Sequence, residues 1–160
     1  MAKIELKNVA HSYSPDVENP EYALKKCNLS WKDGGRYAVL GPSGCGKTTM
    51  LNIMSGLVTP SEGTIKFDGI DITNMSTAER NIAQVFQFPV IYNTMTVAQN
   101  LGFPLLCRNY PKEVITKKVD QVAQTLGLET LLNLRATKLT ADQKQLISLG
   151  RGLVREDVAC

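Results

Sequence analysis

Residues Gly41 to Thr48 have the types and the spacing of a loop that holds phosphate. They match the pattern G-x-x-x-x-G-K-[ST], in which glycines precede a lysine and a hydroxyl residue. Glycine lets the backbone turn its N–H groups toward one point, and a helix that begins at such a loop adds the partial positive charge of its N-terminus. The pattern therefore predicts a site for the triphosphate tail of a nucleotide. Its residues are Gly41, Pro42, Ser43, Gly44, Cys45, Gly46, Lys47 and Thr48.

Three side chains at the end of this loop, the P-loop, could act directly on a nucleotide. Lys47 is expected to reach the β- and γ-phosphates, and the Thr48 hydroxyl is expected to bind Mg²⁺. Thr49 follows and is expected to contact the α-phosphate side. A glycine-rich turn without a ligand is the alternative. The surroundings favour the phosphate site, because an apolar run over residues 37–40 precedes the loop and apolar residues at helical spacing follow it.

The composition is that of one folded domain. Of the 160 residues, 43% are hydrophobic and 21% are charged, so neither a disordered nor a fibrous protein is expected. The net charge of +3 is low for a nucleic-acid-binding protein. Four cysteines lie far apart, which favours reduced thiols over disulfides or a zinc site. No apolar run has the length of a signal peptide or a membrane span.

The apolar pattern also predicts the strands. Alternation of apolar and polar residues predicts half-buried strands over residues 3–9 and 23–31, and a hairpin over residues 64–72 around Asp68-Gly69. A continuous apolar run over residues 37–40 is expected to be a fully buried strand, and residues 82–86 are expected to form another apolar strand. The only histidine, His11, stands near a strand end and is expected to be solvated rather than catalytic.

Helices are predicted between and after these strands. Apolar residues at helical spacing predict one helix over residues 47–55, with Gly56 as its C-cap, and another over residues 112–126, ended by Gly127. The pattern T-x-x-Q at Thr96 and again at Thr140 predicts two further helix starts. The order of elements is that of an α/β core followed by a mainly helical region.

Two further motifs are needed, because a P-loop alone is compatible with kinases, GTPases, RecA-like motors and transporter ATPases. Gln87 lies forty positions after Lys47, in the run Ala-Gln-Val-Phe-Gln, and Leu139-Thr140-Ala141-Asp142-Gln143 stands at a predicted helix start. With the P-loop, these motifs make essentially the whole chain similar to the nucleotide-binding subunit of an ABC transporter of the importer branch. In that family the glutamine is the Q-loop, and Leu-Ser-Gly-Gly-Gln opens the signature helix.

The resemblance implies an α/β fold, a P-loop NTPase core with an N-terminal antiparallel β-sheet and an α-helical subdomain, incomplete at the C-terminus. Residues 1–87 would form the core and the sheet, residues 88–150 the helical subdomain, and residues 151–160 a return to the core. ATP and Mg²⁺ are the implied ligands. The family's nucleotide sites lie between two subunits, so a second copy or a related chain is an implied partner.

Family roles follow for single residues outside the P-loop. Tyr13 stands where the family places an aromatic residue that stacks on adenine, and Tyr22 is a lesser candidate. Gln87 would contact Mg²⁺ and the attacking water. The apolar segment from Phe88 to Tyr92 would either meet the permease or join the core of the helical subdomain.

The signature segment, residues 139–143, departs from the family's usual sequence. The family presents this helix start to the γ-phosphate held by the opposite subunit, a role that would fall to Leu139, Thr140, Ala141, Asp142 and Gln143. Thr140 keeps the hydroxyl that can cap the helix. The carboxylate of Asp142 favours a helix N-terminus but repels phosphate, so it either points away or weakens this half-site. Arg151, on the same helix, is expected to be structural or coupling.

Three catalytic groups of the family have no counterpart in the sequence. In the family, the strand after the signature helix ends in Asp-Glu, and a later histidine contacts the γ-phosphate. Residues 158–160 resemble the first residues of that strand. Little or no hydrolysis is therefore expected from these residues alone, and a partial sequence is the simplest explanation.

The resemblance implies an ATPase subunit that powers import of a small solute, a carbohydrate or a polyol such as glycerol or glycerol-3-phosphate. The implied partners are a second nucleotide-binding subunit, two membrane permease subunits and, indirectly, a solute-binding protein, with no nucleic acid. The implied location is peripheral, on the cytoplasmic face of the inner membrane. The alternatives are a non-catalytic ATP-binding fragment or degenerate partner subunit and, with less support, a P-loop kinase or GTPase.

Overall fold

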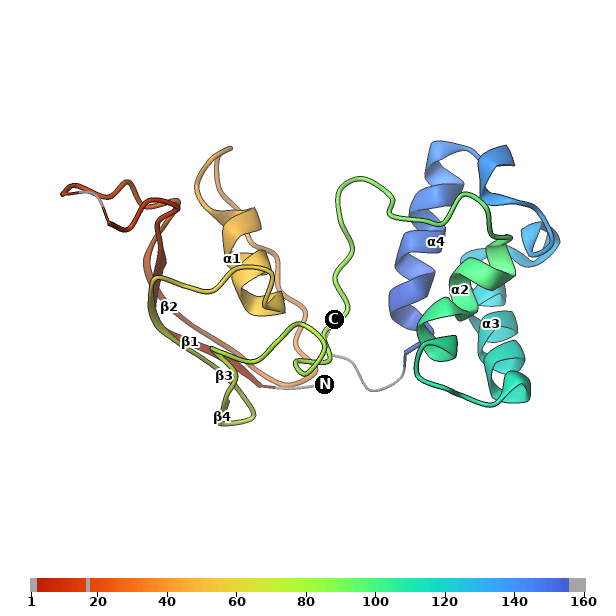
Figure 1. Ribbon diagram of the computed structural model, residues 1–160, viewed down its shortest axis with the longest axis horizontal. Helices are drawn as coiled ribbons and strands as arrows, with labels where there is room; N and C mark the ends of the chain where they lie inside the picture. The colour runs from red at the N-terminus through yellow and green to blue at the C-terminus, as the bar shows by residue number, and fades with distance from the viewer. Residues whose placement is uncertain (1–2, 17, 156–160) are drawn as a thin grey trace. The chain divides into compact units, whose positions relative to one another are not determined.

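The computed structural model describes residues 3–16 and 18–155 and has an α/β fold. The described residues form two compact units, one ending at Ile82 and the other beginning at Ala83 (Figure 1). The first unit holds all the strands and one helix, and the second unit is helical. None of the helices in the described ranges is both long enough and apolar enough to cross a membrane.

The first unit is built on an antiparallel sheet in the order β2-β1-β3-β4. Its strands are β1 (Ile4–His11), β2 (Leu24–Trp31), β3 (Glu62–Phe67) and β4 (Ile70–Asp71). The central strand β1 pairs Leu6 with Leu29 on one side and with Ile65 on the other. Asp68 and Gly69 join β3 to β4, both with positive φ (49° and 81°), as a tight hairpin turn requires. The expected alternating strands and the hairpin are confirmed.

Helix α1 (Lys47–Ser55) supplies the other half of this unit's core. Its residues Met50, Ile53 and Met54 are buried in one cluster with side chains of the sheet, Leu6 and Ile65 among them. The helix ends at Gly56, whose φ of 83° is the left-handed conformation expected of a C-cap. Burial of this apolar face fixes the helix whose N-terminus carries the P-loop.

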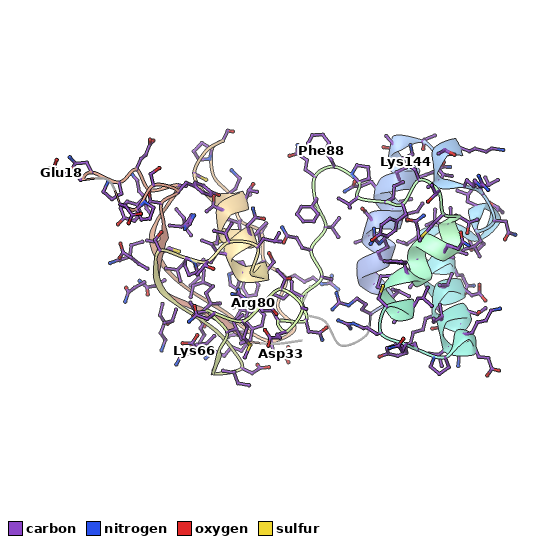
Figure 2. The ribbon with its side chains drawn as sticks, viewed as in Figure 1. Glu18, Asp33, Lys66, Arg80, Phe88 and Lys144 are labelled. Atoms are coloured by element: carbon purple, nitrogen blue, oxygen red, sulfur yellow. The ribbon has the colours of Figure 1, made fainter. Side chains whose placement is uncertain are left out.

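A buried arginine closes the C-terminal end of α1 (Figure 2). The side chain of Arg80 is only 5% exposed, and its guanidinium donates to Ile53 O (2.6 Å) and Met54 O (3.1 Å) of the helix. The same group donates to Thr73 O (2.8 Å) and Met75 O (2.9 Å) of the loop after β4. Burial lowers the pKa of this guanidinium from its ordinary value. Arg80 therefore ties the P-loop helix to the segment that leads toward Gln87.

The two apolar runs expected to form strands are not strands. Residues 37–40 are irregular and exposed, with Leu40 89% exposed, and residues 83–86 have no regular structure either. Across residues 3–16 and 18–155 the sheet contains only β1 to β4, so neither run has a neighbouring strand in it. A fully buried strand forms only where neighbouring strands supply its hydrogen-bond partners. An apolar composition does not show whether such neighbours are present. The strand start expected at residues 158–160 lies outside the described residues.

The second unit packs three helices, α2 (Val97–Leu106), α3 (Lys112–Leu126) and α4 (Ala141–Leu153), with the 3₁₀ turns η1 (Glu129–Leu131) and η2 (Ala136–Lys138). Its buried cluster takes residues from each helix, including Leu101, Val119 and Ile147. The helix expected over residues 112–126 is confirmed, and Gly127 ends it with a φ of 66°. The core of this unit fixes α4, at whose start the signature segment lies.

Both predicted capping boxes are present in the second unit. Thr96 Oγ1 accepts from the N–H of Gln99 (3.2 Å), and the Gln99 side chain accepts from the N–H of Thr96 (2.9 Å). Thr140 and Gln143 repeat this exchange at 3.3 Å and 3.0 Å. Each box satisfies two N–H groups that a helix start otherwise leaves without partners.

Candidate functional site

The P-loop turns into α1 through two glycines in the left-handed conformation, Gly44 (φ 81°) and Gly46 (φ 90°). Gly46 is the N-cap of α1, and no side chain caps the helix there. No acidic residue stands in the first turn of α1. The N–H groups of this turn thus keep their partial positive charge for an anion, which is the arrangement that phosphate-binding loops use.

The Lys47 side chain folds back across the P-loop. Its ammonium donates to Gly41 O (2.8 Å) and Pro42 O (2.7 Å), and Cys45 Sγ lies 3.6 Å from the same nitrogen. A positive charge is therefore held beside the uncapped helix start. The donor set of backbone amides and one ammonium fits a polyphosphate. Thr48 is exposed at the same helix start, where its hydroxyl can reach a cation carried by such a ligand.

Tyr13, at the end of β1, is brought to the P-loop helix. Its hydroxyl lies 3.5 Å from Oγ1 of Thr49, which is buried in the first turn of α1. The Tyr13 side chain is nevertheless 64% exposed, so much of its ring remains open to solvent. The structure thus places an open aromatic ring beside the predicted phosphate site, as base stacking needs.

Tyr22, the lesser candidate for base stacking, contacts Glu62 of β3. Its hydroxyl donates to Glu62 Oε1 (2.6 Å), and Lys26 forms an ion pair with Glu62 Oε2 (2.9 Å). The pKa of the Glu62 carboxyl is lowered mainly by the hydrogen bond from Lys26 and, next, by the one from Tyr22. These contacts hold Tyr22 at β3, and Tyr13 is the better placed of the two tyrosines.

Gln87 is exposed, in a segment that α4 holds by side-chain hydrogen bonds. Gln145 Nε2 donates to Phe86 O (3.1 Å), and the N–H of Val90 donates to Ser148 Oγ (3.0 Å). Arg151 Nη1 donates to Val90 O (2.6 Å), and the Arg151 guanidinium lies over the Tyr92 ring at 4.8 Å. The backbone on both sides of Gln87 is therefore attached to the signature helix. Phe88, next in sequence, is 77% exposed and projects away from the segment (Figure 2).

Replacing Ser148 with alanine is expected to loosen this segment locally. The variant removes the acceptor of the Val90 N–H, and one such hydrogen bond contributes about 1 kcal/mol. Amide hydrogen exchange at Val90, followed by NMR, should then rise about fivefold. Thr125→Ala is the matched control, because the Thr125 hydroxyl bonds only Gln121 O of its own helix (2.9 Å). Equal exchange in both variants would contradict the attachment of Val90 to α4.

The signature segment forms a capped helix start, as expected. Leu139 is buried, whereas Thr140, Ala141 and Asp142 are exposed and Gln143 closes the capping box. Asp142 stands in the first turn of α4, where its carboxylate matches the helix dipole. The same turn in α1 has no acidic residue, so the two helix starts differ in their suitability for phosphate.

The predicted site residues divide between the two units. Tyr13 and Gly41–Thr49 belong to the first unit, and Gln87 and Leu139–Gln143 belong to the second. The sequence analysis did not single out Arg80 or Ser148, because their partners lie in other segments of the chain. The expectation that His11 is solvated was wrong, because the residue is only 8% exposed and its ring packs against Tyr13. The sequence around a single histidine near a strand end does not indicate which residues pack over its side chain.

Comparison with known proteins gives one family. Residues 24–158 match the family described as ABC transporter. The chain is 38% identical over 159 residues to the sn-glycerol-3-phosphate import ATP-binding protein UgpC of Brucella abortus (strain 2308), a match that covers 99% of this chain and 44% of that protein. A protein of the same name from Burkholderia thailandensis is 38% identical over 156 residues, covering 98% and 42%.

The solved structures that match are ATP-binding cassettes. The dimeric post-hydrolysis structure of the cassette MJ0796, bound to ADP and Pi, gives a TM-score of 0.82 at 31% identity, covering 94% of this chain and 69% of that one. A nucleotide-free cassette from an ABC transporter gives a TM-score of 0.78 at 26% identity, covering 96% and 65%. The chain spans less than half the length of the curated relatives that it matches.

Proposed function

Because this chain belongs to the ABC transporter family of ATP-binding cassettes, we propose that it binds Mg-ATP at the P-loop and supplies that site to a solute importer. The observation that carries the proposal is the geometry at the start of α1. There an uncapped helix N-terminus, two left-handed glycines and the Lys47 ammonium converge. The ammonium and the helix N-terminus attract anions, and the glycines let the backbone approach a phosphate closely, so the site suits a phosphate group.

Each proposed residue has a defined task toward the nucleotide. The loop Gly41–Gly46, through its backbone N–H groups other than at Pro42, and the Lys47 ammonium would hold the phosphates, and Thr49 would contact the α-phosphate side. Thr48 and Gln87 would bind Mg²⁺, which when bound neutralises phosphate charge. Tyr13 would stack on the base through its exposed face. To reach a phosphate, Lys47 must exchange its bonds to Gly41 O and Pro42 O for bonds to the ligand.

In an assembled dimer, the second unit would contribute to the nucleotide site of the other cassette. Leu139, Thr140, Ala141, Asp142 and Gln143 would face the nucleotide that a second cassette holds. Dimeric cassettes among the solved relatives support this arrangement. We further propose residues 1–87 as the P-loop core, residues 88–150 as the helical subdomain and residues 151–160 as a return to the core; the two compact units of the described residues divide five residues earlier, between Ile82 and Ala83.

We propose that the intact protein hydrolyses ATP and so drives import of a carbohydrate or a polyol such as glycerol or glycerol-3-phosphate. Relatives named for sn-glycerol-3-phosphate import support glycerol-3-phosphate as the solute. The proposed partners are a second cassette, two permease subunits and a solute-binding protein. The proposed place is the cytoplasmic face of the inner membrane. Family membership gives no support to the kinase and GTPase alternatives.

Removing the Lys47 ammonium tests the proposal most directly. Lys47→Ala is expected to lower the affinity for Mg-ATP by more than about tenfold, since charge-assisted hydrogen bonds to phosphate are lost. Isothermal titration calorimetry on the chain measures the change. Lys7→Ala, at an exposed lysine of β1, is the control and should bind as the unchanged chain does. Unchanged ATP affinity in Lys47→Ala would overturn the assignment of the P-loop.

A further inference from the structure

We infer that His11 is a positioning residue, which holds the Tyr13 ring in the orientation that receives the adenine base. The inference rests on the proposed function, because it assumes that Tyr13 stacks on a nucleotide base. His11 and Tyr13 stand two residues apart, at the end of β1, and their side chains meet. The contact makes His11 part of base recognition without touching the nucleotide itself.

The two rings form an edge-to-face pair. Their centroids are 4.6 Å apart and their planes meet at 88°. This geometry is the favoured one for neighbouring aromatic rings, because the positive edge of one meets the negative face of the other. Whichever ring offers its edge, at least one face of Tyr13 stays uncovered by His11, in agreement with its large exposed fraction.

Ser61 fixes the His11 ring from the other side. Its hydroxyl donates to Ser12 O (3.2 Å) and accepts from the N–H of Ser12 (3.2 Å). The same hydroxyl lies 3.3 Å from His11 Nδ1, within hydrogen-bond distance. His11 Nε2 is buried and has no hydrogen-bond partner among the described residues.

An imidazole held in this way has little freedom. It is buried, its Nδ1 is bonded to a serine that is itself bonded to the backbone, and its ring rests against Tyr13.

Tyr13 is thereby held at two points. Its ring meets His11, and its hydroxyl lies near Thr49 of the P-loop helix. An exposed tyrosine without such contacts populates several rotamers and must be ordered when a ligand stacks on it. A ring already oriented beside the phosphate site avoids that loss, so ATP binds more tightly than its triphosphate tail alone would.

Two ligands separate base recognition from phosphate binding. Mg-ATP uses both the P-loop and Tyr13, whereas inorganic tripolyphosphate uses the P-loop alone. We expect His11→Leu to weaken Mg-ATP binding about fivefold and to leave tripolyphosphate binding unchanged. His11→Phe keeps an aromatic ring against Tyr13 and should retain ATP affinity within about twofold of the unchanged chain. Calorimetry with both ligands on all variants provides the measurements.

A double variant tests whether His11 acts through Tyr13. Tyr13→Ala should weaken Mg-ATP binding selectively, and adding His11→Leu to it should weaken binding no further, since the ring to be positioned is gone. Equal weakening of ATP and tripolyphosphate by His11→Leu would overturn the inference, as would ATP affinity unaffected by that change. Additive effects in the double variant would also overturn it. If the unchanged chain bound neither ligand, the proposed function itself would fail. If it bound both and the His11 variants did not behave as expected, only the role of His11 would be overturned.

Discussion

An alanine at position 46 should both destabilise the first unit and abolish the affinity for ATP. Gly46 has a φ of 90°, and a Cβ placed there would lie 2.5 Å from the carbonyl oxygen of Ala23 and 3.1 Å from Leu24 Cδ1. Strain and overlap together should lower the free energy of unfolding by about 3 kcal/mol. The P-loop would have to move away from β2 to relieve the overlap, and its N–H groups would no longer converge. Mg-ATP calorimetry and urea unfolding check both effects.

Gly44→Ala is the matched control for this effect. Gly44 has nearly the same backbone conformation, with a φ of 81°, but a Cβ there would meet nothing within 4 Å. Only the strain remains, so the loss of stability should be about 1 kcal/mol. Trp31, the sole tryptophan of the chain, lies on β2 and makes its fluorescence a probe of this unit. Equal losses in the two variants would contradict the close approach of Gly46 to Ala23.

Replacing Arg80 with methionine should destabilise the first unit by about 3 kcal/mol, because a guanidinium that donates to four carbonyls would be lost from a buried place. Methionine fills much of the space but donates nothing, so the carbonyls of Ile53 and Met54 would be left without this donor. Lys at the same position keeps the charge, but its single ammonium cannot reach both pairs of carbonyls. Arg80→Lys should therefore recover only part of the loss.

The measurement is again urea unfolding followed by Trp31 fluorescence. Arg36→Met makes the same chemical change at an exposed arginine of the first unit, and it should alter stability by no more than about 0.5 kcal/mol. If Arg80→Met unfolded at the same urea concentration as Arg36→Met, the hydrogen bonds from Arg80 to α1 would contribute nothing to the free energy of unfolding.

Local sequence signals predicted the elements that depend on local interactions. The hairpin at Asp68-Gly69, the left-handed glycines after α1 and α3, and both Thr-Gln boxes depend on residues close together in the chain. The P-loop belongs with these elements, because its backbone conformation is set by its own glycines and by the helix that follows. For these elements the residue types and the spacing are sufficient.

Features that depend on distant neighbours were not predictable in this way. The runs at residues 37–40 and 82–86 have the composition of buried strands, but strand formation is decided by a partner elsewhere in the chain. His11 meets Ser61, fifty residues away, and two of the four carbonyls that Arg80 bonds lie more than twenty residues away. Such contacts follow from topology and not from a local pattern.

The two capping boxes are built from neutral groups only. Thr96 and Thr140 bond through hydroxyls, and Gln99 and Gln143 bond through carboxamides. None of these groups gains or loses a proton between pH 2 and 12, in contrast to the glutamate that commonly occupies the third position of such a box. The hydrogen bonds of the two capping boxes are therefore indifferent to acidity, and at the start of α4 only the carboxylate of Asp142, outside the box, adds a charge.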